Sequence, residues 1–207
     1  MATKKNVIVG AARVFIGPSM DPVNNAAGVT ALRATTTVPQ STFLATNFAA
    51  TWRDVGYTQD GLEVATDPSY TDVEVDQLLD AVKTFKDGMT LNISTTLVEA
   101  TLENLLLAWG QPASTLTSTA TDKETVIDGG VLGQVPTEYG LIAVGNGPEK
   151  AGSNAYQERS YFAYRVTSVE GASHTLSRAD AVSIPVTFRA LPADDGRYGF
   201  VRDRNNV

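Results

Sequence analysis

The sequence predicts a mainly β protein, a β-sandwich or barrel with one short α-helix and one long extended loop. Several segments alternate apolar and polar residues with the period of two that is typical of strands. Two Asp-Gly dipeptides, at 60–61 and 87–88, favour tight hairpin turns between such strands. Only one segment has the apolar spacing of a helix. The 207 residues are long enough for one sizeable core, so we expect a single domain over 1–207.

The first predicted strand runs from Asn6 to Gly17, and Gly10 marks a bulge in it. From Trp52 to Leu97 the pattern predicts mainly antiparallel strands. The last of these strands has one face that is expected to pack on the core, formed by Leu91, Ile93, Thr95 and Leu97. Its other face is small, polar and neutral, and it is formed by Asn92, Ser94 and Thr96.

The helix is predicted to begin after Thr101, whose hydroxyl is suited to an N-cap. Gly110 and Pro112 then end it. The apolar residues between these limits have the spacing of one buried stripe: Leu102, Leu105, Leu106 and Trp109. We expect this stripe to lie across the sheet and to close one end of the core.

The chain after the helix predicts a loop followed by further strands. Residues 111–134 are rich in Ser, Thr and Gly and hold at most one short strand, near Thr125–Ile127. Pro185 has no N–H to donate, so it indicates an edge position or the start of a strand. The strands that follow the loop are predicted at 139–144, 159–169 and 182–191, with a turn and a short final strand in 194–201.

The segment from Pro18 to Ala50 interrupts the strand pattern and reads as a long arm-like loop. It is far longer than the usual loop of ~4–6 residues, so it is either a functional arm or a flexible insertion. Ordering its backbone would cost ~1–2 kcal/mol per residue, which requires compensating contacts. Its scattered apolar residues favour an arm that docks on a neighbouring subunit through Val38, Phe43 and Phe48.

Composition limits the class of protein. A formal net charge of −7 and an isoelectric point of about 4.7 argue against a protein that grips nucleic acid through Lys and Arg. Charged residues make up only 19%, which suggests that partners cover part of the surface. No stretch approaches the ~20 apolar residues of a membrane span, and the start Met1–Asn6 lacks the apolar run of a signal peptide. We expect a protein made in the cytoplasm with no membrane partner.

No residue pattern predicts catalysis, a cofactor or a metal site, so we expect a protein that is not an enzyme. Cys is absent, and the single histidine, His174, lies in a turn-like segment where we expect it to be exposed. The acidic residues between 67 and 80 do not follow the ligand order of an EF-hand. The glycines at 145 and 147 do not continue into a phosphate-binding loop, because no helix pattern follows them.

Two segments carry a more specific signal. Residues 54–61 read D-V-G-Y-T-Q-D-G before a strand, and residues 96–105 read T-L-V-E-A-T-L-E-N-L at the entry to the helix. This arrangement resembles the core of the major tail tube proteins of long-tailed, non-contractile bacteriophages. The resemblance implies a structural subunit that forms stacked hexameric rings, with sheets that join between subunits into a hollow tube.

The resemblance also implies partners and a location. The partners are other copies of the chain and the tape measure, tail terminator and distal tail proteins, and the assembly takes place in the host cytoplasm to form the virion tail. DNA passes through such a tube during ejection without specific binding, so its wall should lack clustered Lys and Arg. The residues that we expect to face the lumen are Asp72, Glu74 and Asp76, as one face of a strand, and Asn92, Ser94 and Thr96.

Two alternatives remain open at this point. The long segment 18–50 comes earlier than in the commonest form of this family, and the inner tube protein of a contractile tail, or another phage ring protein, fits the same residues. The alternative from a different class is a carbohydrate-binding β-sandwich, with Trp52, Trp109 and the tyrosines as surfaces that stack on sugars. It predicts a monomer that binds glycan, whereas a tube protein self-associates.

Overall fold

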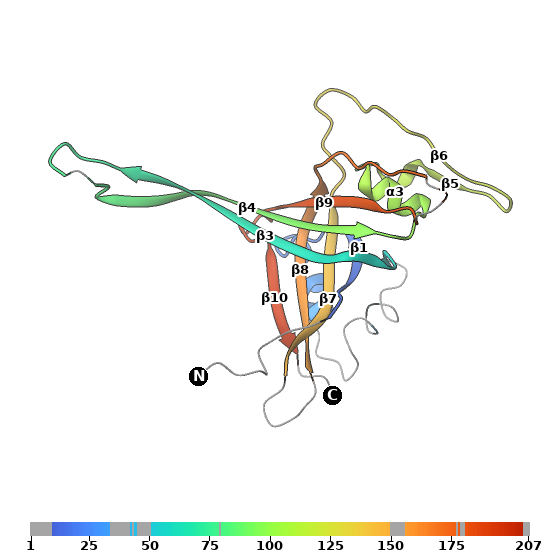
Figure 1. Ribbon diagram of the computed structural model, residues 1–207, viewed down its shortest axis with the longest axis horizontal. Helices are drawn as coiled ribbons and strands as arrows, with labels where there is room; N and C mark the ends of the chain where they lie inside the picture. The colour runs from blue at the N-terminus through green and yellow to red at the C-terminus, as the bar shows by residue number, and fades with distance from the viewer. Residues whose placement is uncertain are drawn as a thin grey trace.

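The computed structural model describes residues 10–33, 42, 44, 51–78, 80–149, 156–176, 178 and 181–204. Within them the fold is mainly β, as predicted, and an eight-stranded antiparallel sheet dominates it (Figure 1). The strands of this sheet are β1 (Arg13–Pro18), β2 (Arg53–Asp54), β3 (Thr58–Val73), β4 (Lys83–Leu97), β7 (Tyr139–Glu149), β8 (Tyr156–Ser168), β9 (Ile184–Leu191) and β10 (Gly199–Arg204). Their order is β2-β1-β7-β8-β9-β4-β3, and β10 pairs with β8.

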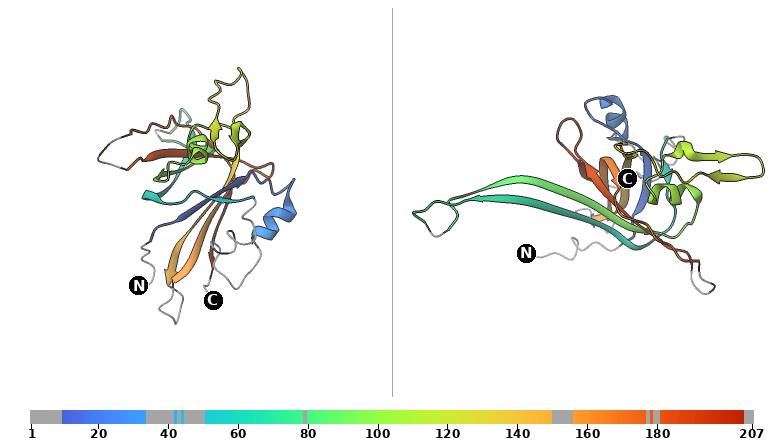
Figure 2. Two further views of the ribbon diagram at one scale, coloured as in Figure 1. Left: turned by 90° about the vertical axis from the view of Figure 1, so that its right-hand side faces the viewer. Right: turned by 90° about the horizontal axis from the view of Figure 1, so that it is seen from above.

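The sheet divides along β8. Residues 158–163 of this strand pair with β10, whereas residues 165–168 pair with β9 on the same side. From β9 the sheet continues into β4 and β3, which run across β7, β8 and β10 (Figures 1 and 2). The strands β9, β4 and β3 therefore form a second layer that lies over the first strands of the sheet. The main core lies between these two layers.

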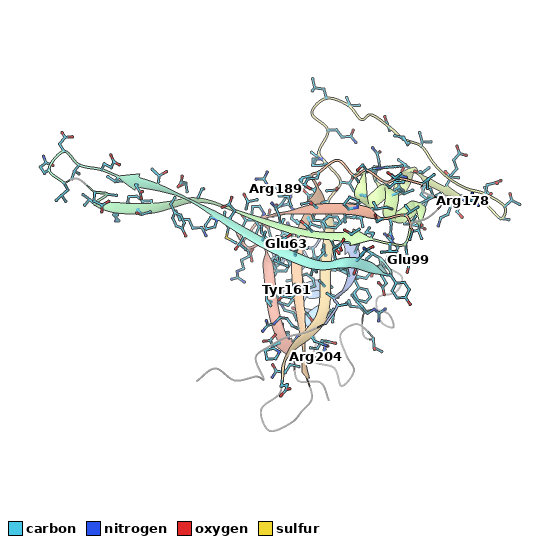
Figure 3. All side chains as sticks on the ribbon, in the orientation of Figure 1. Glu63, Glu99, Tyr161, Arg178, Arg189 and Arg204 are labelled. Atoms are coloured by element: carbon cyan, nitrogen blue, oxygen red, sulfur yellow. The ribbon has the colours of Figure 1, made fainter. Side chains whose placement is uncertain are left out.

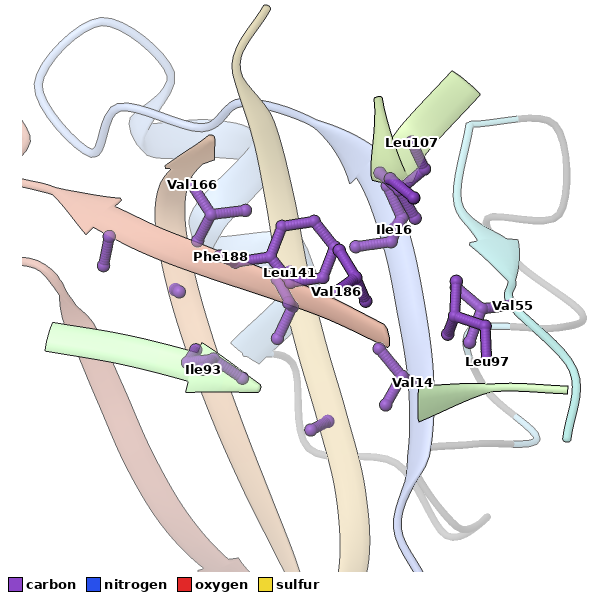
Figure 4. Packing of buried hydrophobic residues seen from close by; sticks show 14 of the residues in the cluster. Val14, Ile16, Val55, Ile93, Leu97, Leu107, Leu141, Val166, Val186 and Phe188 are labelled. Atoms are coloured by element: carbon purple, nitrogen blue, oxygen red, sulfur yellow. The ribbon is translucent and has the colours of Figure 1, made fainter. Parts of the chain in front are cut away.

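Alternation along the central strands gives them a core on both faces. In β1, Val14 and Ile16 belong to the main cluster, while Phe15 between them belongs to a second cluster. In β7, Leu141 and Ala143 point to the main cluster, and the residues next to them point to the second. The main cluster is completed by residues outside β1 and β7, among them these, which Figure 4 labels: Ile93, Leu97, Leu107, Val186 and Phe188.

The second cluster is covered by a helix, α1 (Ala26–Arg33), that the sequence did not predict. It lies inside the segment that was predicted to be a long extended loop, so the prediction of a single helix was wrong. Val29 and Leu32, one turn apart, are its buried residues. The side chain of Asn25 caps the helix by accepting a hydrogen bond from the backbone N of Gly28 at 3.0 Å. The helix has two turns and a glycine in it, which weakened its sequence signal.

Helix α3 (Leu102–Ala108) confirms the predicted limits but not the predicted buried stripe. The side chain of Thr101 accepts a hydrogen bond from the backbone N of Asn104, and Gly110 has a left-handed φ of 66° after the last turn. The residues that the helix buries are Asn104, Leu106, Leu107 and Ala108, whereas Leu102, Leu105 and Trp109 are half-buried. Leu107 and Ala108 close one end of the main core.

β3 and β4 form a long ribbon that projects from the body (Figure 1). β9 pairs with β4 only from Leu91 to Leu97, so the part of β4 before Leu91 pairs with β3 alone. Both Asp-Gly dipeptides lie inside the ribbon, and the prediction of hairpin turns there was wrong. Asp60 and Gly61 form a β-bulge with φ of 65° and 78°, and at a second bulge no residue of β3 lies opposite Asp87 in the strand register.

The remaining elements differ from the predictions in their extent. β1 begins at Arg13, and the predicted strand residues 6–9 lie outside the described part of the chain. The short strand predicted near 125–127 is β6 (Lys123–Thr125), and the prediction of at most one strand was wrong, because β6 pairs with β5 (Leu116–Ser118) in a small hairpin after η2 (Ala113–Thr115). Pro185 is the second residue of β9 and lies beyond the part that pairs with β8, as its missing N–H required.

An ion pair joins the start of β7 to β8. Arg165 donates from Nη2 to Oε1 of Glu138 at 2.7 Å and from Nε to Oε2 at 2.8 Å. These hydrogen bonds hold the pKa of Glu138 below its usual value and raise the pKa of Arg165. A third donor of Arg165 reaches the backbone O of Pro192, so one guanidinium links three segments.

Candidate functional site: the projecting hairpin and its anchor

The outer part of the β3–β4 hairpin exposes large apolar side chains to solvent. Tyr70 is 59% exposed, Leu78 61% and Phe85 49%. Val64, Val73, Val75 and Val82 are also exposed along the same ribbon. A two-stranded ribbon has no core of its own and is only marginally stable, and exposed apolar side chains on it are typical of an interaction surface.

The same hairpin carries much of the negative charge of the chain. Residues 63–87 contain only two cations, Lys83 and Lys86, but seven carboxylates: Glu63, Asp67, Asp72, Glu74, Asp76, Asp80 and Asp87. Two of these carboxylates are held by threonine hydroxyls of the opposite strand. Thr84 Oγ1 donates to Asp72 at 2.6 Å and Thr71 Oγ1 donates to Asp87 at 2.7 Å. The hairpin is therefore both apolar and acidic.

The structure separates the two sets of residues that were predicted to face a lumen. Asp72 lies in β3, but Glu74 and Asp76 lie beyond the end of that strand, so the prediction that the three share one strand face was wrong. These acidic residues are at the tip of the hairpin. Asn92, Ser94 and Thr96 are at its base, where they are half-buried and alternate with the buried residues Ile93, Thr95 and Leu97.

The neutral set forms the centre of a polar outer face on β9, β4 and β3. Ser94 lies between Thr187 of β9 and Glu63 of β3, and its Oγ is 3.3 Å from Oγ1 of Thr187. Asn92 lies next to Arg189, which is exposed like Glu63 (Figure 3). This face therefore presents small hydroxyl and amide groups with one cation and one anion, and no cluster of Lys or Arg.

The base of the hairpin is anchored by a buried amide, Asn104 of α3. Its Nδ2 donates to the backbone O of Val55 at 2.9 Å and to the backbone O of Glu99 at 2.8 Å. Its Oδ1 accepts from Nη1 of Arg53 at 2.6 Å. All hydrogen-bonding groups of this fully buried side chain are thereby engaged. Burial lowers the pKa of Arg53, against the opposing effect of the carboxylate of Glu103.

A second contact joins the same two segments. The carboxylate of Glu99 accepts a hydrogen bond from the backbone N of Tyr57 at 3.1 Å, and the backbone N of Val98 donates to the O of Tyr57 at 3.0 Å. Gly56 has a φ of 85°, and a Cβ there would collide with the carboxylate of Glu99. Segments 54–61 and 96–105, which carry the family resemblance, therefore bind each other at the root of the hairpin.

Other predicted site residues are placed differently or lie outside the described residues. Val38, Phe43 and Phe48 are among those that the structure does not describe. Leu44 from the same segment is fully buried in the second cluster of its own subunit. Trp52 is 2% exposed and cannot stack on a sugar, which removes one of the surfaces on which a carbohydrate-binding function depends.

His174 was predicted to be exposed, but it is half-buried against Trp109, with ring centroids 6.2 Å apart. Among the described residues, no group of three or more His, Asp or Glu side chains is arranged to hold a metal ion. In the same part of the chain, no helix has the length and apolar character needed to cross a membrane. The sequence matches no protein-family model, and a comparison with curated proteins gives no match.

Proposed function

We propose that the protein is a structural subunit that assembles into stacked, hexameric rings and that these rings form the tail tube of a long-tailed, non-contractile bacteriophage. The projecting β3–β4 hairpin carries this proposal. β3 is the last strand of the sheet, so its outer edge has no strand partner within the described chain. A long free edge with exposed apolar side chains is a ready template for pairing with another chain.

The resemblance to tail tube proteins supports the proposal, because the segments that resemble the family, 54–61 and 96–105, lie at the root of the hairpin. Asn104, Glu99 and Gly56 fix the root of the hairpin, so the segments that resemble the family hold the element that we assign to assembly. In the assembled tube, sheets of neighbouring subunits join along their free edges, and the two layers of each subunit form a β-sandwich.

The polar outer face at Asn92, Ser94 and Thr96 is the surface that we assign to the lumen. Its small uncharged groups give DNA no cluster of cations to bind, so the genome can pass without sticking. The acidic set Asp72, Glu74 and Asp76 loses the shared strand face on which its assignment to the lumen depended. The tape measure, tail terminator and distal tail proteins are the expected partners of the tube in the virion.

Electron microscopy of the purified protein tests the proposal. At raised concentration we expect rings or hollow tubes, with interfaces that bury more than ~1,000 Å² in total. Light scattering over the same concentration range should show a growing mass. A protein that stays monomeric at high concentration, both with and without added salt, would contradict the proposal.

A further inference from the structure

An apolar groove of about 480 Å³ lies below the base of the hairpin, where the two layers of the sheet diverge. Val64 and Leu91 of the hairpin line one side of it, and Tyr161 and Val201 of β8 and β10 line the other. The hydroxyl of Tyr198 bridges the two sides by donating to the backbone O of Met89 at 2.7 Å. Val201 is 61% exposed, and among the described strands β10 pairs with β8 alone. The groove is thus open beside a free strand edge.

We propose that this groove receives the tip of the β3–β4 hairpin, residues 70–78 and 80–85, from a second copy of the chain. The inference rests on the proposed function, because it names the contact through which the subunits associate. A tip cannot reach the groove of its own subunit, since β3 and β4 remain paired as one ribbon that leads away from the body (Figures 1 and 2). The contact therefore joins two different surfaces, and its repetition along successive copies produces rings or filaments.

The apolar character of the two surfaces matches. The tip exposes Tyr70, Leu78 and Phe85, and the groove is lined mainly by apolar side chains. Docking would remove both sets from water, which is the main favourable contribution to most protein association.

The charges of the two surfaces are complementary. The hairpin is acidic, whereas the charged residue that lines the groove is Arg197, whose side chain is 69% exposed and whose Nε lies 3.5 Å from Oδ2 of Asp195. The arginines of β8 do not add to this charge, because Arg159 is paired with Asp203 and Arg165 with Glu138. Opposite charge favours the encounter of tip and groove, and like charge disfavours the encounter of two tips.

The charges also argue against another apolar surface as the receiving site. The segment 126–136 exposes Ile127, Val131 and Leu132 on the side of the molecule opposite the hairpin (Figure 1). Asp128 lies within this segment, and neither an Arg nor a Lys does. An acidic tip would meet no cation of that segment, so the groove beside Arg197 is the better match.

Disulfide trapping tests the contact directly, because the chain has no cysteine of its own. Leu78→Cys and Val201→Cys are prepared as two separate proteins. They are mixed, allowed to assemble together and then oxidised. We expect a mixed dimer whose 78–201 linkage is identified by mass spectrometry, at least tenfold above the yield from Leu78→Cys mixed with Leu132→Cys. Leu132 is fully exposed in the segment 126–136 and controls for random collision. Equal yields from the two mixtures would overturn the proposal.

Charge reversal gives an independent readout. Asp72→Lys with Glu74→Lys should raise the protein concentration needed for assembly at least tenfold, and Arg197→Glu in the partner should restore part of the loss. Asp122→Lys with Glu124→Lys, a double change at exposed acidic residues away from the hairpin, is the matched control and should change little. If the wild-type chain does not assemble, the proposed function fails. If it forms tubes while the trapping and charge-reversal pairs behave like their controls, the function stands and the tip-to-groove contact is wrong.

Discussion

Replacing Asn104 by Ala should remove the anchor that holds the root of the hairpin. The change leaves two backbone oxygens, those of Val55 and Glu99, without the donor that the structure gives them, and it leaves Nη1 of Arg53 without an acceptor. A buried polar group that loses its partner costs about 1–3 kcal/mol. Partial access of water to the Arg53 side is expected to limit the total, so we predict a loss of about 3–5 kcal/mol.

The loss is measured by urea denaturation at a concentration where the chain is monomeric, with linear extrapolation to water. Asn24→Ala is the matched control, because it removes the same amide from an exposed hydrogen bond to Asp194. This control should change the stability by less than about 0.5 kcal/mol. Asn104→Asp offers a second comparison. It keeps an acceptor for Arg53 but turns a carboxylate oxygen toward the two carbonyls, so it should also destabilise the fold.

A loss below about 1 kcal/mol for Asn104→Ala would refute the reasoning, since water would then have to replace the buried amide at little cost. A loss of stability equal to that of the Asn24→Ala control would refute it as well. The hairpin itself provides a local readout, because amide exchange at the root should rise more than amide exchange in β7 and β8 when the anchor is removed.

Gly56→Ala should destabilise the protein by at least about 1 kcal/mol more than Gly61→Ala. Both positions have a left-handed backbone, but only a Cβ at position 56 would collide with the carboxylate of Glu99. Urea denaturation of the two variants measures the difference. Glu138→Gln should cost about 1 kcal/mol at pH 7. Its folded pKa is lowered, so this contribution is present above the ordinary pKa near 4.5 and is lost as the pH falls through the lowered value, and the two proteins should converge in acid denaturation. Thr96→Lys should leave tubes intact but slow genome ejection from virions built with it, and unchanged ejection would contradict the lumen assignment.

The elements that the sequence predicted well are those whose signal is local. Alternation from Leu91 to Leu97 is a direct consequence of one buried and one open face, and the structure shows this alternation. The limits of α3 are set by a hydroxyl cap and a left-handed glycine, and both are visible in single residues. The buried stripe of α3 could not be read in the same way, because Asn104 takes an inward position that only its distant partners explain.

The elements that the sequence missed depend on tertiary context. Helix α1 presents only two buried residues, Val29 and Leu32, and it is stabilised by the cluster that it covers rather than by helix propensity. Each Asp-Gly dipeptide was assigned to a turn, since turns and bulges both accept left-handed residues such as Asp60 and Gly61. Only the pairing of β3 with β4 on both sides of the dipeptide distinguishes the two.

These bulges and the acidic residues together explain how an exposed ribbon can avoid uncontrolled pairing. A long free edge would pair with any similar edge, and bulges and charged side chains are the usual means of preventing this. The hairpin has a bulge at 60–61 and another at Asp87, and its carboxylates repel the same edge of another copy. Contact with a surface that presents an arginine is not opposed in this way. The features that protect the ribbon from its own copies thus favour a partner surface such as the groove beside Arg197, and the charge pattern selects head-to-tail association over random aggregation.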